Sequence, residues 1–283
     1  MLKLDKKIGF IGAGNMGEAF IGAIIKADIF SPSMIYACDA KKERLDYLTR
    51  VYGISAFDDN FKLFSASDVV ILAVKPQQID EVLSQIASDR SYEISGRKMI
   101  ISIAAGFSIR KLEDLLYTPL DENAKKKFPV IRVMPNTPAL VRAGIAGMSA
   151  NRNAVSEDIN IARIILEATG EVIEFKEEDL DAVTAVSGSG PAYIFYLVEA
   201  MIQGGVDLGL DLEDAASLTR ATLRGAVSLL EELKESPEVL RRKVTSPGGT
   251  TEAAIKVLDD NRVKEHIVKA IDTAARRSKE LGK

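Results

Sequence analysis

The amino-acid sequence predicts an α/β N-terminal domain built on a parallel sheet, followed by an all-α C-terminal domain. The chain has 283 residues, which corresponds to roughly two domains of about 150 residues each. In its first half, short β-rich apolar runs alternate with helical runs, which is typical of βαβ units. After about residue 175 the strand patterns stop and the apolar residues follow helical spacing.

The strands and helices of the first half can be placed in order. Lys7–Ile11 is predicted to be a strand, and Asn15–Lys26 a helix whose apolar residues share one face. Met34–Cys38 is a second strand, and Lys41–Tyr52 a second helix that ends at Gly53. Three further runs are apolar throughout, as expected of strands buried on both faces: Val69–Val74, Met99–Ile103 and Val130–Met134.

The boundary between the two domains is predicted near the end of the last strand. Ile161–Ala168 has a helical pattern, and Gly170–Phe175 is the last short strand. We therefore expect a first domain over residues 1–172 and a helical domain over residues 173–283. The helices of this second domain are predicted to begin near five residues: Pro191, Asp211, Glu238, Thr250 and Asn261.

The composition excludes several classes of protein. With 47% apolar and 28% charged residues, the chain is expected to fold. Its formal charge of −4 argues against nucleic acid as the main partner. One Cys and one His allow neither an intramolecular disulfide nor a structural zinc site, and no metal site is predicted. Cys38 is expected to be buried and unreactive, and His266 to have a surface or interface role.

No membrane segment or targeting signal is expected. The longest apolar run, Ala192–Val198, is far shorter than the ~20 residues that a membrane span needs. It is predicted to be a helix buried on most sides. Met1–Lys7 is positively charged but lacks the apolar stretch of a signal peptide. A reducing, cytoplasmic location is therefore expected.

A glycine-rich loop joins the first predicted strand to the first helix. Its residues fit the pattern G-x-G-x-x-G: Gly12, Ala13, Gly14, Asn15, Met16 and Gly17. The strand–loop–helix context is the one that the dinucleotide-binding fingerprint requires, and it predicts a Rossmann-type parallel sheet. The free N–H groups at the helix start would face a pyrophosphate. The alternative is a tight turn that merely needs glycine.

Asp39 follows the second strand, at the place of a carboxylate that binds the ribose 2′-hydroxyl. An acid there repels a 2′-phosphate and favours NADH over NADPH. Lys41 and Lys42 weaken this prediction, because either could pair with that phosphate. Asp39 could also cap the helix that starts at Lys41, and both roles can hold together.

Further candidate residues follow strands or precede helices. Ala73, Val74, Lys75 and Pro76 end one strand, and Asn136 stands between two prolines after another; ligands of parallel sheets bind at these ends. In the helical half, Ser187–Pro191 and Ser246–Thr251 are loops of small residues before helices, whose N–H groups would suit a small carboxylate. Thr251 has the hydroxyl best placed to reach the same ligand. Each of these segments could instead be a simple turn or helix connection.

Taken together, these motifs resemble those of pyrroline-5-carboxylate reductases. The resemblance rests on five stretches, which follow one another in the expected order over nearly the whole chain: Ile11–Gly17, Ile71–Gln77, Arg132–Gly144, Ala185–Tyr193 and Val244–Leu258. It implies a Rossmann domain that binds NADH or NADPH and a helical domain for dimerisation and substrate binding. Family members form homodimers that share active sites, and often assemble into decamers.

The resemblance also implies the roles of individual residues. Ser246, Gly248, Gly249 and Thr250 match the loop that holds the carboxylate of a cyclic imine, and Thr251 matches the threonine that meets the ring nitrogen. Ala73, Val74, Lys75 and Pro76 match the stretch that lines the nicotinamide half, with Asn136 nearby. Asp39 departs from many relatives, which carry Asn or Ser there, and so leaves the preference for NADPH open.

The implied reaction is hydride transfer to a protonated C=N bond, in which the protein orients both reactants. Another imine or β-hydroxyacid reductase on the same two-domain plan is an alternative. A hydroxyacid enzyme would need an acid–base lysine, and the helix after Pro191 carries none through Gly209. A nucleotide-sensing protein without turnover is the other alternative, although a sensor would not need the second polar loop.

Overall fold

The computed structural model describes residues 3–282 and divides the chain into two compact units. The first unit comprises the chain up to Ser189 together with the segment from Ala274 onward, and the second comprises Gly190–Thr273. These units divide later in the chain than the domain boundary expected at residue 172. The chain therefore leaves the first unit once and returns to it once.

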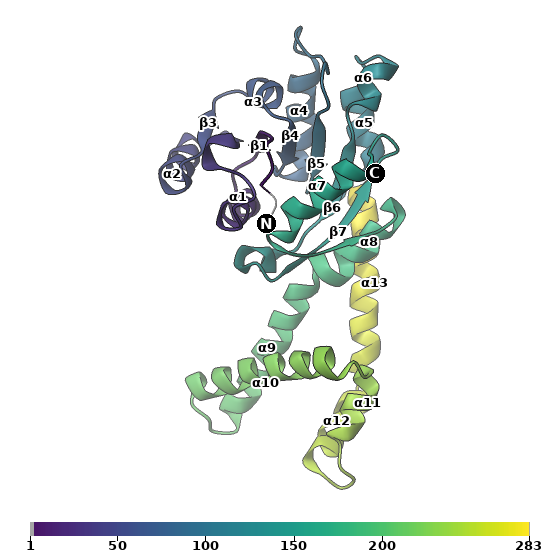
Figure 1. Cartoon of the computed structure of the whole chain (residues 1–283). Helices are drawn as coiled ribbons and strands as arrows, with labels where there is room; N and C mark the ends of the chain where they lie inside the picture. Colours follow the sequence, from purple (N-terminus) through teal and green to yellow (C-terminus); the bar gives the residue numbers. More distant parts are fainter. Residues whose placement is uncertain (1–2, 283) are drawn as a thin grey trace. The chain divides into compact units, whose positions relative to one another are not determined.

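One eight-stranded sheet forms the centre of the first unit, in the order β3-β2-β1-β4-β5-β6-β7-β8 (Figure 1). The strands are β1 (Ile8–Ile11), β2 (Ile35–Cys38), β3 (Ser55–Phe57), β4 (Val69–Leu72), β5 (Met99–Ser102), β6 (Val130–Met134), β7 (Gly144–Ala150) and β8 (Gly170–Glu174). All neighbours pair in parallel except β6 and β7, which are antiparallel. Ile8 of β1 lies opposite Ile35 on one side and Val69 on the other. The strand order therefore reverses at β1.

The Rossmann-type sheet predicted from the sequence is confirmed, with two additions. β3 and β7 were not predicted, and β7 runs antiparallel to β6 in an otherwise parallel sheet. β3 is three residues long and largely exposed, so it carries little apolar signal. β7 has the sequence GIAGMSA, in which Gly147 replaces the apolar side chain that would mark a buried strand. A Cβ atom at Gly147 would lie 2.8 Å from Val183 Cγ1, so packing explains this glycine.

Helices cover both faces of this sheet. Those of the first unit are α1 (Asn15–Lys26), α2 (Lys42–Tyr52), α3 (Asn60–Ala66), α4 (Pro76–Ala87), α5 (Ile109–Tyr117), α6 (Glu122–Lys126), α7 (Ser156–Glu167) and α8 (Leu180–Val183). Short 3₁₀ turns are η1 (Pro32–Met34), η2 (Thr137–Val141) and η3 (Glu177–Asp179). Gly53 ends α2 in the left-handed conformation, with φ +69°, as its place after the helix predicts.

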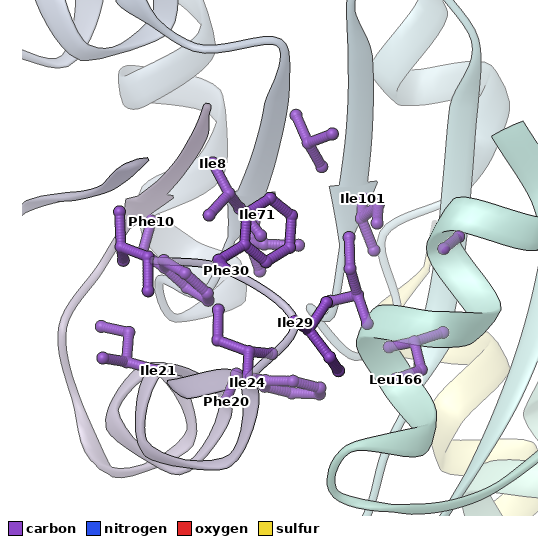
Figure 2. Close-up of a cluster of buried hydrophobic side chains, with 14 of the residues drawn as sticks. Ile8, Phe10, Phe20, Ile21, Ile24, Ile29, Phe30, Ile71, Ile101 and Leu166 are labelled. Atoms are coloured by element: carbon purple, nitrogen blue, oxygen red, sulfur yellow. The ribbon is translucent and has the colours of Figure 1, made fainter. Parts of the chain in front are cut away.

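The two faces of the sheet bury separate apolar clusters. On one face, Phe20 and Ile24 of α1 and Leu166 of α7 pack against Ile8, Phe10 and neighbouring strand residues (Figure 2). The other cluster joins Leu63, Leu83 and Leu112, from α3, α4 and α5, to the opposite sides of the same strands. Because β1, β4 and β5 are buried on both sides, their carboxyl ends are held firmly in place.

The segment that returns to the first unit is the end of α13 (Val263–Leu281). Ser278 is buried, and its hydroxyl donates to Asp181 Oδ1 over 2.7 Å. Asp181 also lies 3.9 Å from buried Arg132 of β6, which forms an ion pair with Glu177 as well. A Cβ atom at Gly106, in the loop after β5, would meet the backbone of Leu281 at 3.2 Å. The end of α13 is therefore part of the first unit's packing.

The second unit is entirely helical, as the sequence predicts. It contains α9 (Gly190–Asp207), α10 (Leu212–Leu233), α11 (Pro237–Lys243), α12 (Thr250–Asp260) and the first part of α13. α9 and α10 meet closely at Gly205, where a Cβ atom would lie 2.9 Å from Ala215 Cβ. No helix in the described part of the chain is long and apolar enough to cross a membrane.

The expectation that Ala192–Val198 is buried on most sides is wrong for the single chain. Within α9, Ile194 is 50%, Phe195 61% and Tyr196 77% exposed. Four apolar residues of α10 are also exposed: Leu218, Val227, Leu229 and Leu230. These helices have more apolar surface than one helical layer in a single chain can bury, so the hydrophobic run reflects a surface for association rather than an internal core.

Candidate functional site

The candidate site lies at the carboxyl edge of the sheet, where the strand order reverses. β2 and β4 flank β1, and the loops after β1 and β4 therefore start side by side. The N–H of Ala73 donates to the carbonyl of Ile11 over 2.8 Å, and the N–H of Gly12 donates to the carbonyl of Cys38 over 2.8 Å. Such a reversal is the place where open α/β sheets bind their ligands.

The glycine-rich loop fits closely into this edge. Gly12 has φ +96°, and a Cβ atom there would lie 2.6 Å from the backbone of Ala73. A Cβ atom at Gly17 would lie 2.5 Å from the carbonyl oxygen of Gly12. Gly14 differs from both, because it is exposed and no atom of the chain lies within 4 Å of its added Cβ. Gly12 and Gly17 shape the loop, whereas Gly14 faces open space.

That open space lies in front of the first turn of α1. Asn15, Met16 and Gly17 begin the helix, and their N–H groups have no acceptor within it, because its first hydrogen bond runs from the Glu18 N–H to the Gly14 carbonyl. Their N–H dipoles favour an anion at this end of the helix. The loop, the helix start and the space at Gly14 therefore fit the pyrophosphate of a dinucleotide.

Asp39 is bound to the glycine-rich loop. One carboxylate oxygen accepts the N–H of Ala13 over 2.7 Å, and the other accepts the N–H of Lys41 over 2.9 Å. The second contact supports the start of α2, in which Lys41 is the capping residue and Lys42 the first helical residue. Each oxygen retains a lone pair for a further donor, such as a ribose hydroxyl. The structural role of Asp39 therefore leaves its ribose-binding role available.

A second charged group reaches the same loop from α2. Arg44 Nε donates to the carbonyl of Ala13 over 2.6 Å, and its guanidinium forms an ion pair with Glu18 of α1. Tyr52 donates its hydroxyl to the other oxygen of Glu18 over 3.0 Å. The sequence did not predict this cluster, because Glu18 lies on α1, far along the chain from Arg44 and Tyr52 on α2.

The loop after β4 adjoins the glycine-rich loop. Ala73 and Val74 are half-buried against it, and Lys75 is exposed at the start of α4. Pro76 is the first residue of that helix, as predicted. The segment 103–106, after β5, reaches the same edge between the ends of β4 and β6. Sequence reasoning missed it, since alanine and glycine side chains there offer no chemical signal.

Asn136 holds two other segments together. Its Oδ1 accepts the N–H of Ile145 over 3.0 Å, and its Nδ2 donates to the carbonyl of Ser187 over 3.2 Å. The side chain therefore fastens the end of β6 to β7 and to the segment before α9. The predicted rigid loop is present, since Pro138 lies in η2 directly after Asn136.

The prediction of an open loop at Ser187–Pro191 is wrong. Residues Thr184–Gly188 form a π-helix, η4, and the helix continues into α9 at Gly190. The N–H of Ser189 donates to the carbonyl of Thr184 over 2.8 Å, so it is not free for a ligand. A Cβ atom at Gly188 would lie 2.6 Å from Met134 Cε. Gly188 therefore packs against Met134, and a glycine in such a contact gives the same sequence pattern as one in an anion-binding loop.

The loop Ser246–Thr251 belongs to the second unit. Gly248 has φ +70°, and the N–H of Gly249 closes a turn onto the carbonyl of Ser246 over 3.0 Å. α12 begins at Thr250, with Thr251 half-buried in its first turn. The N–H of Gly248 donates to the carboxylate of Glu252 over 2.8 Å. A carboxylate of the chain itself thus binds the N–H of Gly248 in this loop.

Within residues 3–282 no cluster of His, Cys, Asp and Glu could hold a metal ion. His266 is exposed on α13. Cys38 is 6% exposed at the end of β2, and burial, together with the carboxylates of Asp59, Asp39 and Asp58, raises the pKa of its thiol to about 11.

We expect Cys38 to resist thiol reagents while the chain is folded. At pH 8 the raised pKa leaves almost no thiolate, and burial blocks access. Titration with Ellman's reagent should detect almost no thiol in the native protein and the full content of its single cysteine in guanidinium chloride. Rapid labelling of the native protein would contradict this placement of Cys38.

Two family models match the chain. A model described as pyrroline-5-carboxylate reductase dimerisation matches residues 177–281. A model described as NADP oxidoreductase coenzyme F420-dependent matches residues 7–106, which include the glycine-rich loop and the loop after β4. The two matches fall on the helical half and on the nucleotide half of the fold, respectively.

Whole proteins match over nearly their full length. Pyrroline-5-carboxylate reductase 2 of Bacillus subtilis is 39% identical over 98% of this chain and 95% of its own. The pyrroline-5-carboxylate reductase of Methanosarcina acetivorans is 40% identical over 99% of both chains. Among solved structures, the Plasmodium falciparum pyrroline carboxylate reductase with NADP bound has a TM-score of 0.86 at 30% identity and covers all of both chains.

Proposed function

Since the chain belongs to the pyrroline-5-carboxylate reductase family, it reduces 1-pyrroline-5-carboxylate to L-proline with NAD(P)H, and we propose which of its residues bind and orient the two reactants. This reaction is the last step of proline biosynthesis. The substrate is a small molecule, and the matched dimerisation region makes the protein an oligomer. The main support for the residue roles is the glycine-rich loop at the reversal of the strand order.

The nucleotide is proposed to bind along the carboxyl edge of the sheet. Six consecutive residues would hold the pyrophosphate: Gly12, Ala13, Gly14, Asn15, Met16 and Gly17. Asp39 would accept a hydroxyl of the adenosine ribose. Ala73, Val74, Lys75 and Pro76 would line the nicotinamide half, where Lys75 is an exposed cation. Asn136 would contribute there mainly by fixing the backbone around Ile145 and Ser187.

The imine carboxylate is proposed to bind the loop of Ser246, Gly248, Gly249 and Thr250. The Gly248 N–H already binds the carboxylate of Glu252, and the first turn of α12 adds N–H groups whose dipoles favour an anion. Thr251 would hydrogen-bond the ring nitrogen. Its hydroxyl can accept from the protonated imine and can donate to the amine of the product, so one side chain serves both states.

The chemistry needs few protein groups. When bound, the reduced nicotinamide supplies the hydride that adds to the C=N carbon. The chain's residues orient the ring by its carboxylate and its nitrogen, which are two separate points on a small molecule. Orientation of this kind removes much of the entropic barrier to a reaction between two bound reactants.

Residues 1–172 are proposed to bind the nucleotide, and residues 173–283 to bind the substrate and to form the dimer. The exposed apolar residues of α9 and α10 support a homodimer through the helical half, because such a surface is unfavourable in water. Assembly of dimers into a decamer and a cytoplasmic location complete the proposal. Sedimentation analysis can measure the oligomer size directly.

The proposed role of Asp39 is tested by Asp39→Asn. The amide keeps an oxygen that can accept from the Ala13 N–H, and it removes the negative charge that repels a 2′-phosphate. The ratio of kcat/KM for NADPH to that for NADH should rise by about tenfold, which corresponds to ~1.4 kcal/mol. An unchanged ratio would remove Asp39 from cofactor selection.

A direct assay tests the function as a whole. The purified protein is mixed with NADH or NADPH, and oxidation is followed at 340 nm before and after 1-pyrroline-5-carboxylate is added. Oxidation of the nucleotide that depends on the cyclic imine and yields proline is the result expected of the reductase. Absence of turnover with both nucleotides would contradict the reductase function.

A further inference from the structure

We propose that Glu18 helps to select the nucleotide, because it binds Arg44 and so withholds this guanidinium from the 2′-phosphate of NADPH. The inference rests on the proposed binding of the nucleotide at the glycine-rich loop. It assigns a specificity-determining role to a residue of α1 that carries no such signal in the sequence. It also predicts that a cation suited to NADPH is already present at the site but is neutralised.

Arg44 lies at the right end of the site for this role. The N–H of Ala13 binds Asp39, and the carbonyl of Ala13 binds Arg44 Nε, so the carboxylate and the guanidinium contact the same residue of the loop. The end of β2 is where dinucleotide-binding folds distinguish the two nucleotides: an acid binds the ribose hydroxyl, and a nearby arginine accommodates the phosphate. This chain has both groups at that place.

The contacts of Arg44 keep it away from an added phosphate. One guanidinium nitrogen pairs with Glu18 Oε2, and Nε is bound to Ala13. The guanidinium carbon also lies 5.1 Å from the ring centroid of Tyr47. An arginine binds phosphate best through two parallel N–H groups, and the nitrogen that pairs with Glu18 belongs to each such pair that the guanidinium can offer. The ion pair therefore competes directly with a 2′-phosphate.

Glu18 is itself held in position. Tyr52 donates to its second oxygen over 3.0 Å, and the side chains of Glu18 and Arg44 are 23% and 25% exposed. Burial alone would raise the pKa of Glu18, but the hydrogen bonds from Arg44 and Tyr52 outweigh it and lower that pKa. The carboxylate is thus ionised at neutral pH. A half-buried, doubly bonded ion pair is harder to open than an exposed one.

Other charges at this end of the site do not compensate for Arg44. Lys41 and Lys42 are exposed at the start of α2, and neither side chain has a fixed hydrogen-bonded position among the described residues 3–282. Asp39 adds a negative charge next to them. Releasing Arg44 would therefore add the one cation whose position relative to the loop is fixed by Ala13.

The test compares the binding of NAD⁺ and NADP⁺, which differ only in the 2′-phosphate, by isothermal titration calorimetry. Glu18→Gln removes the charge but keeps an amide that can still bond to Tyr52. We expect the Kd for NADP⁺ to fall at least about fivefold relative to that for NAD⁺, whose Kd stays within about twofold. Glu174→Gln, which breaks a separate ion pair with Arg163, should leave both constants unchanged and serves as the matched control.

A second variant separates the release of Arg44 from a simple loss of negative charge. In the Arg44→Met background, Glu18→Gln should no longer improve the binding of NADP⁺. If Glu18→Gln still improves NADP⁺ binding in that background, Glu18 acts only by repelling the 2′-phosphate, and the proposal is overturned. Arg44→Met alone should leave the affinity for NADP⁺ within about twofold of the original, because the ion pair already withholds this guanidinium.

The other possible outcomes separate the proposed role of Glu18 from the proposed nucleotide site on which it rests. A fall of about fivefold or more in NADP⁺ affinity in Arg44→Met alone would show that Arg44 already binds the phosphate, and would overturn the inference. An unchanged ratio of the Kd for NADP⁺ to that for NAD⁺ in a folded Glu18→Gln variant would also overturn the inference, but it would leave the proposed nucleotide site standing. Failure of the unmodified protein to bind either nucleotide would overturn both the site and the inference.

Discussion

Replacing Thr251 by alanine is expected to lower kcat by at least about tenfold while the Kd for NADH stays within about twofold. The proposed hydrogen bond holds the ring nitrogen in place while it changes from imine to amine, so its loss affects the reacting geometry directly. The nucleotide is proposed to contact the glycine-rich loop and the loop after β4, which do not contain Thr251. Steady-state kinetics and calorimetric titration measure the two quantities separately.

The controls for this prediction use the hydroxyl groups of the same region. Thr251→Ser keeps a hydroxyl and should retain most of the activity. Thr245, just after α11, has a hydroxyl that donates to the carbonyl of Arg241 in that helix. Thr245→Ala removes only this contact and should leave kcat within about twofold. If Thr251→Ala retains full kcat, or if Thr245→Ala has an equal effect, the proposed role of Thr251 is wrong.

The second large effect concerns Gly14 and Gly17, which should respond to the same substitution in opposite ways. Gly14→Ala is expected to leave the thermal unfolding midpoint within about 2 °C and to weaken NADH binding at least about tenfold. The backbone of Gly14, at φ −68° and ψ −169°, suits any residue, and its added Cβ meets no atom of the chain. The methyl group would instead occupy the space proposed for the pyrophosphate.

Gly17→Ala should destabilise the fold itself. Its Cβ would lie 2.5 Å from the carbonyl oxygen of Gly12, a backbone atom fixed between β1 and β4. We expect the free energy of unfolding to fall by about 2–4 kcal/mol, despite the better helix propensity of alanine. Thermal unfolding with and without NADH distinguishes the variants, because only a variant that binds the nucleotide is stabilised by it. Unchanged NADH binding by Gly14→Ala would contradict the proposed cradle.

The parts of the fold that were predictable are those in which local pattern and packing require the same residues. β1, β4 and β5 are apolar throughout because both faces of the sheet are covered. Gly53 and Pro76 mark helix boundaries because their backbone restrictions act locally. The placement of Gly12 and Ala73 at one edge of the sheet was predictable, because each directly follows a strand and the strands are parallel.

The parts that were missed depend on contacts between distant residues. Gly188 of Ser187–Pro191 packs against Met134, and nothing in the local sequence distinguishes this glycine from one in an anion-binding loop. Glu18 and Arg44 meet only because α1 and α2 lie against each other. The apolar run in α9 predicted burial, but its residues are exposed in the single chain, because a local pattern does not tell which surface covers it.

The return of α13 to the first unit has a consequence for folding during synthesis. Domains usually fold in the order in which they leave the ribosome. Here the nucleotide-binding unit is made almost entirely before Gly190–Thr273, yet its contacts at Ser278 with Asp181 and at Leu281 with Gly106 form only afterwards. The unit that is synthesised first is therefore the last to be completed, and the whole helical unit emerges while the loop after β5 still lacks its cover.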